Sequence, residues 1–105
     1  MTKVAYNNCY GGFMLSSKVL NYLRQHGMPT DENGWIEHPD GTYENINYTI
    51  ARHNPILIEA LEKYPDNEIS IAEITGDRYW IWEYDGIEHV YTPETIPWTI
   101  INKED

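Results

Sequence analysis

The sequence has little cysteine, few basic residues and no long apolar run. Its 105 residues include one Cys, and seven Lys plus Arg stand against seventeen Asp plus Glu, for a formal net charge of −10. One cysteine excludes an internal disulfide framework. No apolar run approaches the roughly 18 residues that a membrane-spanning helix needs, and no signal-peptide pattern opens the chain. These absences predict a soluble, cytoplasmic protein.

The shortage of basic residues also limits the class of partner. Binding to phosphate groups depends on clustered Lys and Arg side chains, so we expect no direct contact with nucleic acid and none with an anionic membrane surface. An acidic chain fits two other interpretations, which are a well-solvated surface and a protein partner with a basic surface. The acidic residues form no block, which favours the first without excluding the second.

Aromatic residues are abundant. Four Trp and nine Tyr accompany a hydrophobic share of 41%. This composition is too apolar for a disordered chain, and the length fits one domain over residues 1–105.

Two segments have helical spacing with start and stop signals. Ser16 is a good N-cap, and Leu15 with Leu20 fits a hydrophobic staple, so a helix is predicted over residues 17–26 with Gly27 as its stop. In a second segment, Asn54 caps a helix that has Pro55 at its first position and ends before Pro65.

Other segments are typical of strands. Residues 3–10 are rich in Val and Tyr and predict a first strand. Turn signals at 33–34 and 39–41 bound a short strand over residues 35–38. We expect residues 42–50 to pair with it in a short polar hairpin, and the alternative is an irregular loop. The apolar residues within 68–75 do not alternate strictly, which favours a central strand buried on both faces; they are Ile69, Ile71, Ala72 and Ile74. The first strand, the first helix and a later strand are compatible with a right-handed crossover.

The clearest local signal is a hairpin near the end of the chain. Two β-rich runs flank Asp85-Gly86, a favoured two-residue turn. This turn sets a register in which Trp82 lies opposite His89 and Glu83 opposite Glu88. The order of elements predicts an α+β fold: two helices packed on one face of a mainly antiparallel sheet of four to six strands, with this C-terminal hairpin.

The hairpin register gathers large rings on one face. That face carries Trp80, Trp82, Tyr84, His89 and Tyr91. These rings are a candidate interaction surface, or alternatively the core beneath the helices. The facing carboxylates of Glu83 and Glu88 are interpreted as two solvated groups at the hairpin tip, and the alternatives are a nearby Arg78 or Arg52 or a bound cation.

A second candidate site is the turn before the first helix. It comprises Tyr6, Asn7, Asn8, Cys9, Tyr10, Gly11 and Gly12. Backbone amides leading into a helix can hold an anion, and aromatic rings can stack on a small ligand. The structural alternative is a tight turn beside a small buried cysteine. The four histidines have no metal-ligand spacing, so neither a metal nor a cofactor is predicted.

Three segments resemble a group of small uncharacterised proteins associated with bacteriophages and prophages. They are "YNNCYGGFMLS", "RHNPILIEALEK", and "ISIAEI" followed by "YWIWEYDGIEHV". The resemblance implies a phage-related context, hence the host cytoplasm, and no known activity.

Three hypotheses about function follow. The first is a small, acidic, non-enzymatic protein that binds a protein partner through the aromatic hairpin. The second is a binder of small molecules or nucleotides at residues 6–13. The third is an enzyme that depends on Cys9, for which no catalytic constellation is present.

Overall fold

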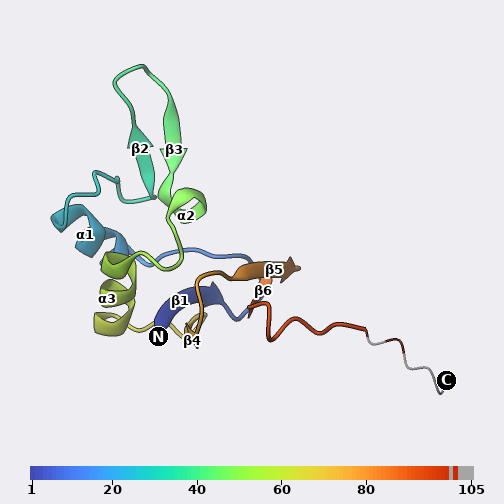
Figure 1. The fold of residues 1–105 in the computed structure, drawn as a ribbon. Helices are drawn as coiled ribbons and strands as arrows, with labels where there is room; N and C mark the ends of the chain where they lie inside the picture. Colours follow the sequence, from blue (N-terminus) through green and yellow to red (C-terminus); the bar gives the residue numbers. More distant parts are fainter. Residues whose placement is uncertain (100, 102–105) are drawn as a thin grey trace.

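The computed structural model describes residues 1–99 and 101. The chain combines helices with antiparallel strands in the order β-α-β-β-α-α-β-β-β, so the predicted α+β class is confirmed (Figure 1). The elements are β1 (Thr2–Asn7), α1 (Ser17–Gln25), β2 (Trp35–Glu37), β3 (Tyr43–Asn45), α2 (Ile46–Thr49), α3 (Pro55–Lys63), β4 (Ile69–Ile74), β5 (Trp80–Tyr84) and β6 (Ile87–Tyr91).

The strands form three two-stranded antiparallel sheets, β1–β4, β2–β3 and β5–β6. The predicted single sheet of four to six strands is therefore only approximated. β6 lies beside β1 without a backbone ladder between them. At this junction the backbone N–H of Asn7 donates to the carboxylate of Glu88 instead of to a backbone carbonyl. A side chain thus occupies the place of a ladder bond, and the two sheets remain separate.

The predictions for β4 need correction. β4 pairs with β1 alone among the described strands and runs antiparallel to it, so it is neither a central strand nor part of a parallel crossover. Its residues do not alternate because its two ends are buried in different places. Ile69 and Ile71 pack against the helical core, whereas Ile74 lines a surface cavity with His53 and Tyr79.

Both predicted helices are confirmed, and local signals explain their ends. The Ser16 side chain accepts from the Val19 N–H at the start of α1, and Leu15 and Leu20 are both buried, as a staple requires. Asn54 caps α3 by accepting from two backbone amides, with Pro55 at the first helical position.

The middle of the chain contains the predicted hairpin and one unpredicted helix. β2 pairs with β3, and this hairpin projects from the rest of the molecule (Figure 1). The chain then turns at once into the short helix α2, which Asn45 caps through its side chain. Ile46 at the first position of α2 is buried in the core, and this tertiary contact explains a helix with no periodic signal.

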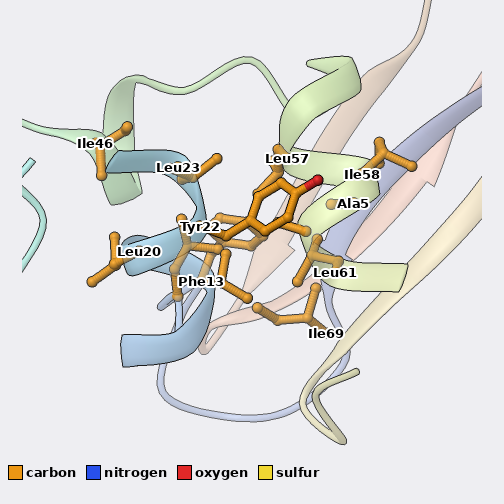
Figure 2. Packing of buried hydrophobic residues seen from close by; sticks show 13 residues of the cluster. Ala5, Phe13, Leu20, Tyr22, Leu23, Ile46, Leu57, Ile58, Leu61 and Ile69 are labelled. Atoms are coloured by element: carbon orange, nitrogen blue, oxygen red, sulfur yellow. The ribbon is translucent and has the colours of Figure 1, made fainter. Parts of the chain in front are cut away.

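The core lies between α1, α3 and β1 (Figure 2). Leu23 from α1 and Leu57 from α3 are fully buried, and Ala5 from β1 and Ile69 from β4 complete this layer. The two main helices thus pack on each other, and α3 also packs on β1. Phe13 enters the same core from the turn before α1, which fixes that turn against the body of the protein.

Candidate functional site: the aromatic hairpin and its anchor

The β5–β6 hairpin has the register that the sequence predicted. Trp82 lies opposite His89, Glu83 opposite Glu88, and Tyr84 opposite Ile87 across the turn. Asp85 has φ 51° and Gly86 has φ 87°, the pair of positive values that a type I′ turn requires. The dipeptide therefore determines both the position and the twist of the hairpin.

One face of this hairpin is an exposed layer of rings, here called the aromatic face. Its members are Trp80, Trp82, Tyr84, His89 and Tyr91. Trp80 is 52% exposed, Trp82 42% and Tyr84 64%, and His89 is exposed as well, so the alternative that these four rings form the core beneath the helices is wrong. Tyr91 is half-buried.

The rings of the aromatic face pack against one another. Trp82 stacks on Tyr84 with centroids 6.1 Å apart and lies 5.9 Å from His89. His89 in turn stacks on Tyr91 at 6.1 Å, and Trp80 lies 6.0 Å from Tyr91. These separations fall within the range of favourable aromatic pairs. The result is a continuous surface of rings, which orders the side chains while leaving them open to solvent.

The opposite face of the hairpin is anchored to the body by an ion pair. Nη1 of Arg52 lies 2.5 Å from Oε1 of Glu88, and Nη2 lies 2.9 Å from Oε2, a two-bond geometry. The Glu88 side chain is buried and that of Arg52 mostly so. The Arg52 guanidinium also lies 3.6 Å from the centroid of the Phe13 ring. Arg52 thereby joins the hairpin to the core.

Asn7 completes this anchor from the other end of the chain. Its side-chain amide donates to the carbonyl oxygens of Gly86 at 2.6 Å and Cys9 at 2.5 Å, and its backbone N–H donates to Glu88. Asn7 is 1% exposed. Asn7, Arg52, Gly86 and Glu88 are called the Glu88 cluster below. Because Glu88 points inward, the prediction that both Glu83 and Glu88 are solvated is wrong for Glu88.

The two glycines of the N-terminal turn lie against the hairpin tip. A Cβ added to Gly86 would lie 2.4 Å from the Gly12 nitrogen and 2.7 Å from the Gly11 nitrogen. The three glycines therefore allow two backbones to approach closely. This contact brings together two turns that are far apart in the sequence, at residues 11–12 and 85–86. Each turn has its own sequence signal, and neither signal predicts the contact between them.

The remaining residues of the 6–12 turn are placed in different environments. Tyr10 and Asn8 are exposed, Tyr6 and Cys9 are half-buried, and Asn8 donates to Ser70 Oγ at 2.5 Å. The turn thus does not gather all seven predicted residues around one pocket.

A surface cavity of about 370 Å³ lies beside this turn, lined by Gly12, Phe13, Arg52 and Glu88 among others. Every buried side-chain polar atom in the described part of the chain has a hydrogen-bond partner. The anion-binding interpretation of residues 6–13 stays a prediction, and the polar groups of the Glu88 cluster have a structural use without it.

The sequence predicts no role for Phe13, and it indicates Arg52 only as one possible cation near the two carboxylates. The placement of Glu83 opposite Glu88 was the signal, because one of two facing carboxylates needs a partner. Which one is paired depends on the orientation of the hairpin relative to the body.

Two whole-chain observations accompany this geometry. Within residues 1–99 and 101, no group of three or more His, Cys, Asp or Glu side chains is arranged to hold a metal ion. The helices of this same part of the chain are all too short or too polar to cross a lipid bilayer.

Comparisons of the chain with protein-family models, with curated proteins and with solved structures found no match in any of the three.

Proposed function

We propose that this protein is a small, acidic, non-enzymatic interaction protein that binds a protein partner through the aromatic face. The observation that supports this most is that four of its five neighbouring rings, all except the half-buried Tyr91, are exposed on one side of the hairpin. Trp and Tyr are the side chains enriched in the energetically important centres of protein interfaces. An exposed aromatic patch lowers the solubility of a protein unless a binding partner covers it.

The charge around the hairpin supports a partner with a basic surface. Residues 79–99 contain Glu83, Asp85, Glu88 and Glu94 and no Lys or Arg. Arg52 neutralises Glu88, which leaves three uncompensated carboxylates close in sequence to the rings. A negatively charged surface accelerates the encounter of the protein with a positively charged partner and disfavours acidic partners. The same field disfavours direct contact with nucleic acid. In the phage-related context that the sequence resemblance implies, the partner is a host or phage protein of the host cytoplasm.

The test is affinity capture from a lysate of the host cell with three tagged proteins. They are the wild type, Trp82→Ser in the aromatic face and Trp35→Ser in the β2–β3 hairpin. Trp35 is a matched control, since it is an exposed Trp of a hairpin at 47% against 42% for Trp82.

The wild type and Trp35→Ser should retain the same protein, and Trp82→Ser should lose it. Measured with the purified partner, Trp82→Ser should weaken binding by about tenfold or more, because truncating a central aromatic residue commonly costs over 1 kcal/mol. Equal recovery by the wild type and Trp82→Ser would exclude the aromatic face as the binding surface. Recovery by none of the three proteins would argue against the proposed function as a whole.

A further inference from the structure

β5 has one unpaired edge. It pairs with β6 on one side, and no other strand of the described chain pairs with it. In a hairpin with a two-residue turn, the residues next to the turn form a hydrogen-bonded pair, and such pairs then alternate along the strands. The pairs at Tyr84, Trp82 and Trp80 are therefore bonded to β6. The backbone N–H and C=O groups of Ile81 and Glu83 point outward from the open edge.

This open edge borders the aromatic face. A strand added along β5 would continue the pleat, so every second side chain of that strand would lie beside Trp80, Trp82 or Tyr84. The other side chains would lie beside Ile81 and Glu83. Edge strands with unpaired backbone groups are the sites at which proteins add an extended peptide as a further strand.

The charges select among possible occupants of this edge. The hairpin and the segment after it, residues 79–99, supply carboxylates and no Lys or Arg. Lys and Arg side chains bind favourably over Trp and Tyr rings and next to carboxylates. A second copy of this chain would bring another net charge of −10 to the same place, which opposes self-association.

We infer that the β5 edge binds an extended segment of the partner as an added strand, with Lys or Arg side chains at the positions beside Trp80, Trp82 and Tyr84. This inference rests on the proposed function, because it specifies how the same hairpin recognises its partner. Backbone hydrogen bonds from Ile81 and Glu83 hold the segment, the rings bind its Lys or Arg side chains, and the negative charge of the hairpin disfavours an acidic segment.

The test uses amide hydrogen exchange with three peptides of the same length. The first alternates Arg and Val, the second alternates Glu and Val, and the third is the first with N-methyl groups on alternate residues. The Ile81 and Glu83 amides report strand addition, whereas the Trp82 and Tyr84 amides, already bonded to β6, serve as internal controls.

The Arg–Val peptide at about 1 mM should slow exchange at Ile81 and Glu83 by about tenfold or more, with little change at Trp82. The Glu–Val peptide should have no effect. N-methylation of the residues that face β5 should abolish the protection, because it removes donors without altering the side chains.

Four results would overturn the inference. One is absence of any binding of the Arg–Val peptide at about 1 mM. Another is a change in Trp fluorescence with unchanged exchange at Ile81 and Glu83, which would mean that the rings bind side chains alone. A third is equal protection by the N-methylated peptide. The fourth is a dimer by light scattering with both amides already protected in the free protein, which would identify a second copy as the occupant. If Trp82→Ser still loses the captured partner, the proposed function stands in all of these cases.

Discussion

Asn7 and Glu88 are 81 positions apart in the sequence and share a buried hydrogen bond, in which the Asn7 N–H donates to Glu88 Oε1 at 2.8 Å. Glu88 simultaneously receives both terminal nitrogens of Arg52. This arrangement connects the first strand, the loop before α3 and the last hairpin. The hairpin is thereby held with its aromatic face outward.

The buried ion pair should matter more for stability than a surface pair. Glu88→Gln leaves the mostly buried Arg52 charge without a partner and should lower the free energy of unfolding by about 3 kcal/mol or more. Glu62→Gln is the control, since it breaks the exposed Lys3–Glu62 pair and should change the free energy of unfolding only slightly. Urea denaturation measures both. Similar losses for the two variants would mean that the Glu88 cluster does not hold the hairpin.

The close approach of the two glycine turns should make Gly86 sensitive to substitution. Gly86→Ala forces a side chain into a positive φ and against the Gly11 and Gly12 nitrogens. Gly76→Ala is a matched control, because Gly76 has φ 89° and nothing within 4 Å of an added Cβ.

The control should cost about 1 kcal/mol for the backbone strain alone, and Gly86→Ala should cost about 1 to 3 kcal/mol more because of the clash. Thermal denaturation compares the two. Equal melting temperatures would show that the N-terminal turn does not lie against the hairpin tip.

Tyr22 should give the protein a pH-dependent stability in alkali. The hydrogen bond to the Glu59 carboxylate, followed by burial, raises the pKa of Tyr22 from 10.0 to about 12. A raised pKa in the folded state stabilises the fold fully below pH 10, and this contribution is lost as the pH rises through about 12.

The difference in unfolding free energy between the wild type and Tyr22→Phe should therefore shrink over this interval. In a Glu59→Gln background, the same comparison should depend much less on pH. A difference that is constant across the interval in the wild-type background would contradict this prediction. Urea denaturation at each pH provides the measurement.

The tryptophans should report an exposed and negatively charged environment. Trp35, Trp80, Trp82 and Trp98 are all classed as exposed. When each quenching constant is divided by that of free N-acetyltryptophanamide, Cs⁺ should quench the native fluorescence more strongly than I⁻ at equal ionic strength, because the surrounding field attracts cations. In urea the difference between the two ions should decrease as the chain expands. Stronger quenching by I⁻ would argue against a basic partner for this surface.

The sequence alone determined the features that depend on neighbouring residues. Ser16 and Asn54 set the starts of α1 and α3, and Asp85-Gly86 set the turn and register of β5–β6. These features follow from capping and turn geometry, which act over a few positions. They were enough to predict the α+β class and to list the rings of the candidate site.

Which face of the hairpin is exposed depends on contacts between distant parts of the chain. Both faces carry large apolar side chains, so local patterning favours neither. The outcome depends on Arg52, 36 positions from its partner Glu88, and on Asn7, 79 positions from Gly86. A buried carboxylate requires a cation and donors, and these come from parts of the chain that no local signal connects. For the same reason the sequence did not predict that β1 and β6 would be joined through a side chain instead of a backbone ladder.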